Sequence, residues 1–109
     1  MPRPIYRRGR EYAETMRALL YHCRHPERDE GLESYQRALV EQARSLLAPR
    51  EFECLCSYYL RRRSIMQSAE DLRVNQSTVC RNIHRGEAKV DKLLQLAREI
   101  SPVRFQLMS

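Results

Sequence analysis

Hydrophobic residues recur three and four positions apart along most of the chain, the spacing that gathers them on one face of an α-helix. A first stripe predicts a helix over residues 10–24, which ends before Pro26 and the polar run that reaches Gly31. A second predicts a helix over residues 32–47, and a third begins at Pro49, a residue suited to the first turn of a helix. The three stripes comprise Tyr12, Met16, Leu19, Leu20 and Cys23; Leu32, Tyr35, Leu39, Ala43, Leu46 and Leu47; and Phe52, Leu55, Cys56, Tyr59 and Leu60.

Two further helices are marked by their capping residues. Ser64 followed by Gln67 matches a capping box, and predicts a short helix with Ala69 and Leu72 facing inward. Asn75 is a favourable cap for a long helix over residues 76–99, which Pro102 terminates. Its apolar stripe comprises Val79, Ile83, Val90, Leu93, Leu94 and Ala97. The pattern thus predicts an all-α fold of five helices and no strand: a helical bundle with a C-terminal helix-turn-helix and a long last helix.

The 109 residues are enough for one compact domain. We expect a basic arm at residues 1–10, an N-terminal helical hairpin at 11–47, the helix-turn-helix unit at 48–100 and a tail at 101–109. The basic N-terminus is not followed by the apolar stretch of a signal peptide, and no run is long enough to cross a membrane. These features predict a cytoplasmic protein that does not contact membranes.

The charge of the chain favours nucleic acid as a partner. Lys and Arg total 20 against 14 Asp and Glu, which gives a net charge of +6, and Arg far outnumbers Lys. Arg forms bidentate contacts with phosphates and with guanine edges. A solvated basic surface without a ligand would have the same composition, so charge alone leaves both interpretations open.

The residues of possible catalytic or metal sites do not form a convincing pattern. The four cysteines, Cys23, Cys54, Cys56 and Cys80, lack the paired spacing of a zinc site, and are interpreted as reduced, small hydrophobic residues. The histidines do not pair with an evident nucleophile, and there is no glycine-rich phosphate loop. We therefore expect no metal, no cofactor and no enzymatic activity.

Residues 64–85 have the plan of a helix-turn-helix, with a small residue at the helix contact and polar side chains on the outer face of the second helix. At 100° per residue Val79 and Ile83 share the inner face. The outer face carries Ser77, Arg81, His84, Arg85 and Ala88. Arginine pairs with guanine O6 and N7, and Gln76 or Asn82 could pair with adenine edges. Any exposed helix also carries polar residues, but here the caps, the interface and the polar face agree.

A resemblance to a known family appears at these residues. The segment Leu47-Ala48-Pro49-Arg50-Glu51 resembles the L-T-P-R-E opening of the fourth region of bacterial RNA polymerase sigma factors. The segment A-E-D-L-R-V-N-Q-S-T-V-C-R at residues 69–81 resembles that family's A-E-x-L-x-V-S-x-S-T-V-S-R, and R-G-E-A-K-V at residues 85–90 resembles its R-A-x-x-K-L. The match covers residues 46–97. The S-T-V-x-R spacing is fairly specific, whereas L-x-P-R-E also occurs in LuxR-type regulators.

The resemblance implies a domain that reads double-stranded promoter DNA in the major groove and can contact RNA polymerase. It implies that Gln76, Ser77, Arg81 and Arg85 read base edges, and that Arg62, Arg63, Ser64 and Thr78 hold phosphates.

The chain also departs from the family pattern. Ala48 replaces a capping Thr, Ser68 replaces an apolar residue and is expected to weaken the packing of its helix, and Arg73 stands where a turn Gly is usual. The chain has no room for the sigma region that melts the promoter. A sigma-like transcription regulator is therefore a better description than a complete sigma factor.

Three alternatives remain open at the level of sequence. The chain could be an adaptor that docks on RNA polymerase or on a sigma or anti-sigma partner without reading DNA. The run Arg61–Arg63 could be a solvated helix end rather than a phosphate contact. The apolar stripe of the first helix could be core, which is favoured, or a dimer seam. Leu19, Leu20, Leu39 and Leu46, with Tyr12 and Tyr35, are the residues that a possible homodimer would use.

Overall fold

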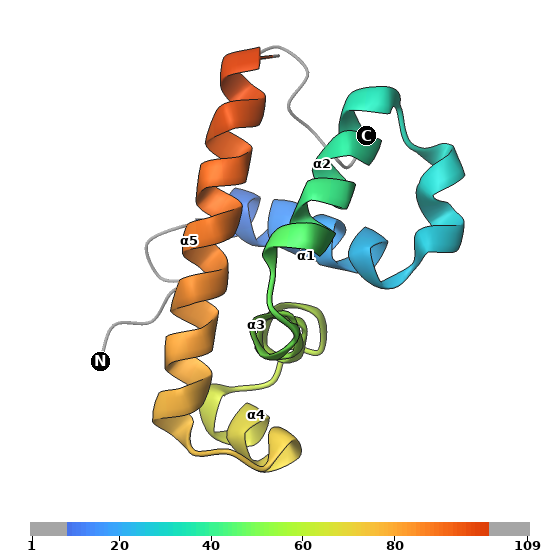
Figure 1. Ribbon diagram of the computed structural model, residues 1–109. Helices are drawn as coiled ribbons and strands as arrows, with labels where there is room; N and C mark the ends of the chain where they lie inside the picture. Colours follow the sequence, from blue (N-terminus) through green and yellow to red (C-terminus); the bar gives the residue numbers. More distant parts are fainter. Residues whose placement is uncertain (1–8, 101–109) are drawn as a thin grey trace.

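The computed structural model describes residues 9–100, and side chains up to Arg98 (Figure 1). In chain order the elements are α1 (Gly9–Arg24), the 3₁₀ helix η2 (Pro26–Gly31), α2 (Ser34–Leu46), α3 (Pro49–Leu55), the π-helical turn η3 (Cys56–Leu60), α4 (Ile65–Leu72) and α5 (Gln76–Ile100). There is no strand within residues 9–100, so the expected all-α bundle with a long last helix is confirmed. Most of the expected arm and all of the expected tail lie outside the described residues.

Two boundaries differ from those that the pattern predicts. The polar run after Pro26 forms the 3₁₀ helix η2 instead of an irregular break, because a proline at a first helical position does not prevent a new turn. The third helix is also not continuous. After Leu55 the spacing of the backbone hydrogen bonds increases from four residues to five: the Arg61 N–H donates to the Cys56 carbonyl oxygen at 3.0 Å. Such a π-helical turn cannot be recognised from hydrophobic spacing alone.

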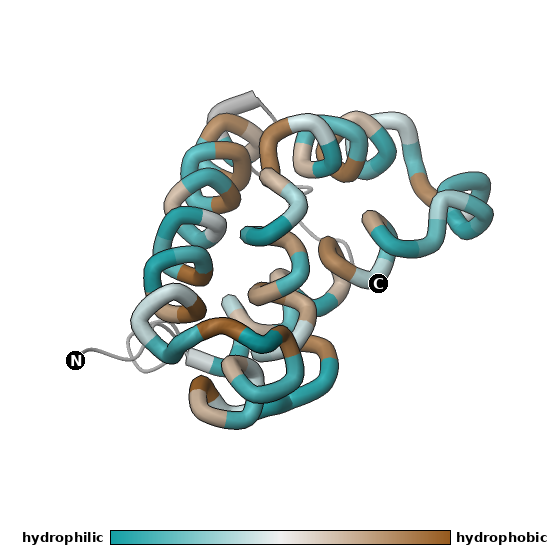
Figure 2. Tube along the Cα trace, turned by 60° about the horizontal axis from the view of Figure 1, so that its bottom comes forward, coloured by the Kyte–Doolittle hydropathy of each residue, from teal (hydrophilic) through white to brown (hydrophobic). Residues whose placement is uncertain are grey.

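The segment formed by α3 and η3 occupies the middle of the molecule (Figure 1). Helix α5 packs against α3, helix α4 packs against η3 and the start of α5, and α1 packs against η3. Helix α2 contacts both α1 and α5, so the N-terminal hairpin covers one side of the central segment. Hydrophobic and hydrophilic stretches alternate along the helices in Figure 2, as expected of helices that each bury one face.

The stripe of α1 belongs to the core of a single chain. Met16, Leu19 and Leu20 are all 0% exposed, and Leu39 is 6% exposed. These leucines are therefore not available as a dimer seam. The expectation that Leu46 belongs to the buried stripe was wrong: its side chain is 44% exposed, because it is the last residue of α2. Leu47, just beyond the helix end, faces the core instead and is 8% exposed.

A buried glycine sets the distance between α3 and α5. A Cβ atom added at Gly86 would lie 2.6 Å from Leu55 Cδ1 and 3.1 Å from Leu55 Cγ, and Leu55 is itself fully buried. Interiors at crystal-like packing density do not absorb such an overlap without movement. The missing side chain at Gly86 thus allows the close approach of the two helices.

Arg44 of α2 joins the parts of the N-terminal hairpin. Its guanidinium forms a two-pronged ion pair with Asp29 of η2, with Nη1–Oδ2 at 2.9 Å and Nη2–Oδ1 at 3.2 Å. It also donates to the carbonyl oxygens of His22 and Cys23, at 2.7 and 3.2 Å, near the end of α1. These carbonyls lack partners within α1, so Arg44 satisfies the helix terminus and fixes η2 against it.

Candidate nucleic-acid interface

Helix α4 begins with the capping box that the sequence predicts. Ser64 Oγ accepts the Gln67 N–H at 3.0 Å, and the Ser64 N–H donates to Gln67 Oε1 at 3.0 Å. Both bonds satisfy backbone or side-chain groups that the first turn would otherwise leave to water. The start of α4 is therefore fixed by local sequence.

The turn between α4 and α5 is built on a left-handed residue. Arg73 has φ 60° and ψ 46°, the uncommon backbone conformation anticipated from its place in a glycine position. The Val74 N–H donates to the Ala69 carbonyl at 3.0 Å, which closes the helix end in a Schellman arrangement. A residue with a Cβ pays about 1–2 kcal/mol for this conformation. The turn is accordingly held by its hydrogen bonds and by the packing of Val74, not by backbone preference.

Asn75 caps α5, as the sequence predicts. Its Oδ1 accepts the Thr78 N–H at 2.8 Å and the Ser77 hydroxyl at 2.9 Å, while its carbonyl accepts the Val79 N–H at 3.2 Å. The cap fixes the point where α5 starts and therefore the rotation of every side chain that follows. Thr78 is half-buried in this first turn.

The inner faces of α4 and α5 are closed by apolar contacts and by one polar pair. Val79 and Ile83 are 0% exposed and Ala69 is 6% exposed, as expected. Ser68, also 0% exposed, forms a hydrogen bond of 2.7 Å with Ser57 Oγ on η3, which is itself fully buried. The expectation that Ser68 weakens the packing overlooked this partner. Two hydroxyls that satisfy each other are a stable alternative to an apolar contact.

The four residues that the resemblance assigns to base reading lie in the first three turns of α5. Gln76, Ser77, Arg81 and Arg85 are all exposed. No intramolecular hydrogen bond or ion pair engages Gln76, Arg81 or Arg85 among the described residues. Asn82, the other candidate for an adenine edge, is half-buried and donates its amide to the Thr78 carbonyl at 2.9 Å. The free side chains of Arg81 and Arg85 therefore lie on one face of the first three turns, whereas Gln76, seven residues before the buried Ile83, is exposed because it is the first residue of the helix.

The basic run before α4 does not act as a unit. Arg63 forms a two-pronged ion pair with Asp71 of α4, with Nε–Oδ2 at 2.8 Å and Nη2–Oδ1 at 3.1 Å. The hydrogen bonds from Arg63 hold the pKa of the Asp71 carboxyl below its ordinary value of 3.8. Arg62 has φ 60° and extends toward α1, away from its neighbour. The structure thus separates two arginines that the sequence places side by side.

A partly buried ion pair joins the two outer segments of the family resemblance. Lys89 Nζ of α5 lies 2.8 Å from Glu51 Oε1 of α3, and it also donates to the Leu46 carbonyl at 2.9 Å. The same Glu51 oxygen accepts the Ala48 N–H at 2.9 Å, so Glu51 supports the start of α3 although Ala48 has no capping side chain. Burial raises the pKa of Glu51, but the hydrogen bonds from Lys89 and Ala48 outweigh it, and the pKa lies below 4.5. Lys89 is therefore a structural residue.

A second buried carboxylate fixes the middle of α5. The Tyr59 hydroxyl of η3 donates to Glu87, which is 2% exposed. Burial, followed by the bond to Glu87, raises the pKa of Tyr59 well above its ordinary value of 10.0, so this hydroxyl stays protonated. One turn further along α5, Asp91 accepts the Tyr12 hydroxyl of α1 at 2.9 Å. The two tyrosines hold α5 against α1 and η3, and neither pair can be predicted from the hydrophobic pattern.

The thiols of Cys23, Cys54 and Cys56 are protonated because they are buried. Burial raises the pKa of the Cys23 thiol to about 12 and raises those of Cys54 and Cys56 above their ordinary value. Within the described part of the chain, no three His, Cys, Asp or Glu side chains are arranged to hold a metal ion. None of the helices described is both long and apolar enough to span a bilayer.

Comparisons of the chain with models of protein families, with curated protein sequences and with solved structures found no match. The functional inference accordingly depends on the residues themselves, above all on the free polar face of α5.

Proposed function

We propose that this protein binds double-stranded DNA in a sequence-specific way and regulates transcription. The observation that carries the proposal is the outer face of α5, where Arg81 and Arg85 are exposed and form no hydrogen bond or ion pair among the described residues. The start of this helix is fixed by the Asn75 cap, and Gln76 is exposed at its first residue. Side chains that read bases need to be free of internal bonds and to start from a backbone of fixed orientation, and the capped helix provides both conditions.

The dimensions of this face suit the major groove. Ser77, Arg81 and Arg85 follow one another at four-residue steps, each a rise of about 6 Å along the helix axis. The three positions therefore span about 12 Å, the length of three to four base pairs at about 3.4 Å each. An α-helix fits the major groove, and arginine pairs there with guanine O6 and N7. The net charge of +6 adds a favourable long-range attraction to the phosphate backbone.

The resemblance to sigma region 4 extends the proposal. In that interpretation α4 and α5 read an upstream promoter element, and RNA polymerase is a further partner. Ser64 and Thr78 lie at the starts of α4 and α5, where backbone N–H groups also favour a phosphate. Arg62 joins them as a phosphate contact, whereas Arg63 would first have to exchange Asp71 for a phosphate.

The runner-up is an adaptor that docks on polymerase or on a sigma or anti-sigma partner without reading DNA. One observation favours it: Met66, on α4, is 57% exposed and offers an apolar side chain to a protein partner. An apolar docking surface and a phosphate interface respond differently to salt, which allows the two proposals to be separated.

The decisive experiment is a selection of duplexes from a random library by the whole chain, followed by affinity measurements on the selected site at several salt concentrations. We expect an enriched motif of a few base pairs per protein, and an affinity that falls steeply as salt rises. The same titration on a mixed-sequence duplex is the control. A library that shows no enrichment, together with duplex binding too weak to measure at low salt, would favour the adaptor.

We also propose that the protein binds paired half-sites as a homodimer. Its interface would have to lie outside the leucines of α1 and α2 that the core already buries. Sedimentation of the free and DNA-bound protein at micromolar concentration tests it. A 13.0 kDa monomer in both states would contradict the dimer and favour dependence on polymerase for affinity.

A further inference from the structure

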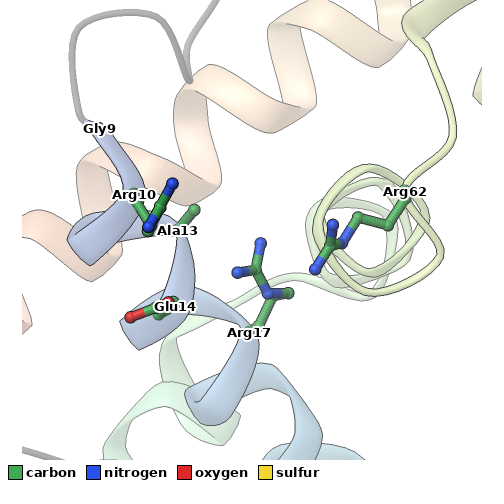
Figure 3. Close-up of a pocket in the computed structure, with 6 residues that line it drawn as sticks. All are labelled: Gly9, Arg10, Ala13, Glu14, Arg17 and Arg62. Carbon is green, nitrogen blue, oxygen red and sulfur yellow. The ribbon is translucent and has the colours of Figure 1, made fainter.

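An unusual group of arginines surrounds a pocket between α1 and the turn that precedes α4 (Figure 3). The pocket has a volume of about 490 Å³ and is lined by Gly9, Arg10, Ala13, Glu14, Arg17 and Arg62. Arg17 and Arg62 come from segments 45 positions apart, and in Figure 3 their guanidinium groups point toward one another. Glu14 points away from both of them in the same view.

These arginines differ from the paired arginines of the molecule. Arg44 and Arg63 each face an aspartate in a two-pronged ion pair. In contrast, no hydrogen bond or ion pair engages Arg10, Arg17 or Arg62 among the described residues. Like charges that converge on one hollow repel one another, and a bound anion would turn this repulsion into attraction. Arginine is the side chain best suited to such an anion, since its planar fork gives two parallel hydrogen bonds to a phosphate.

We propose that Arg10, Arg17 and Arg62 form a binding site for a phosphate group. The backbone of the turn contributes, because the left-handed conformation of Arg62 directs its side chain toward α1 and away from the ion pair of Arg63 with Asp71. The site does not depend on DNA reading by α5, since none of its residues belongs to that helix. The phosphate could belong to a nucleic-acid backbone or to a free phosphorylated compound, and both present the same chemistry to the pocket.

The first test is a titration of the whole chain with inorganic phosphate at constant ionic strength, followed by NMR of the arginine Nε–H signals. We expect saturable shifts at Arg17 and Arg62. Arg17→Gln should weaken the apparent affinity about fivefold to tenfold, the effect of one charge-assisted hydrogen bond in a partly exposed site. Arg28→Gln, which removes an exposed arginine of η2, is the matched control and should leave the affinity unchanged. Shifts that do not saturate, or that are equal in Arg17→Gln, would overturn the proposal.

The second test separates the two sources of the phosphate. A loss of affinity in Arg17→Gln for every duplex alike, with a salt slope reduced by about one, assigns the pocket to the DNA backbone. Unchanged duplex binding together with lost phosphate binding assigns it to a free phosphorylated compound. Failure of the proposed DNA reading would appear as absent duplex binding by the unmodified protein, and would leave the phosphate titration of this pocket unaffected.

Discussion

The polar side chains on the inner and outer faces of α5 differ in whether they are bonded to the rest of the chain. On the inner side Glu87 and Lys89 are paired with Tyr59 and Glu51, and they hold the helix in place. On the outer side Arg81 and Arg85 are exposed and form no hydrogen bond or ion pair among the described residues. A single helix thus carries polar groups that stabilise the fold and polar groups that are free for a ligand. The contrast shows that the type of a residue does not distinguish a side chain that stabilises the fold from one that is free to bind a ligand, whereas the hydrogen bonds of that side chain do.

The largest expected effect is on the outer face. Arg81→Ala should cost about 1–3 kcal/mol of binding free energy on the selected DNA site and little on mixed-sequence DNA, because it removes a base contact. Unfolding should be unaffected, since the side chain is exposed and unpaired. Fluorescence anisotropy and thermal unfolding measure the two effects, with Arg28→Ala as the control. Equal losses on both duplexes would assign Arg81 to the phosphate backbone.

Substitution of the two serines beneath α4 should lower the stability of the protein, in contrast to Arg81→Ala, which should lower only DNA affinity. Ser57→Ala leaves the buried hydroxyl of Ser68 without its partner and should lower the free energy of unfolding by about 1–3 kcal/mol. The double variant Ser57→Ala with Ser68→Ala removes both hydroxyls. Its loss in free energy of unfolding should be smaller than the sum of the losses in the two single variants. Denaturant unfolding of the unmodified protein, Ser57→Ala, Ser68→Ala and the double variant gives the coupling free energy between the two hydroxyls. Strictly additive losses would mean that the hydroxyls do not stabilise one another.

The ion pair of Lys89 and Glu51 should reveal itself through pH. Lys89→Met leaves the buried Glu51 without its cation and should lower stability by about 1–2 kcal/mol at neutral pH, less than for a fully buried pair because Lys89 is 38% exposed. The pKa of Glu51 is depressed in the folded protein, so its contribution is present above pH 4.5 and lost as pH falls through the folded pKa. The stability difference between the two proteins should therefore shrink in acid.

Lys92→Met, at an exposed neighbouring position, is the control for this pH series and should change little at any pH. A difference between Lys89→Met and the unmodified protein that stays constant down to pH 3 would contradict the assignment of Glu51 as the partner.

The smallest effect is expected at the turn, where the two faces are set relative to one another. Arg73→Gly should raise the free energy of unfolding by about 0.5–1 kcal/mol, because glycine adopts the left-handed conformation without steric cost. Arg73→Ala keeps a Cβ in the same conformation and should give no gain. Chemical unfolding of both variants checks the difference, and equal stability of the two would show that the backbone at Arg73 is not strained.

What could be predicted from the sequence was largely local. Ser64 and Asn75 were recognised as caps because their partners lie three residues further along the chain. The apolar faces followed from spacing, except at the helix end, where Leu46 is exposed. The exposed positions on α5 followed from the rotation of an ideal helix that starts at a known cap.

The features that escaped prediction depend on contacts between distant segments. The partner of Ser68 lies on η3, and the partner of Lys89 lies 38 positions earlier, so neither pair leaves a periodic signal. The side chains of Arg62 and Arg63 point in different directions although the two residues are adjacent in sequence, because the left-handed backbone of Arg62 turns the chain at this point. The π-helical turn likewise follows from tertiary packing, which a pattern of hydrophobic residues does not contain.

The close approach at Gly86 also constrains how this sequence could have changed over time. Any substitution there places a Cβ 2.6 Å from Leu55 Cδ1, so a larger residue at position 86 requires Leu55 to move or to be replaced by a smaller residue. The order of the two substitutions matters: Leu55→Val followed by Gly86→Ala passes through a cavity, whereas the reverse order passes through an overlap. Positions 55 and 86 are therefore expected to covary among descendants of this chain, with valine or alanine opposite alanine and leucine opposite glycine.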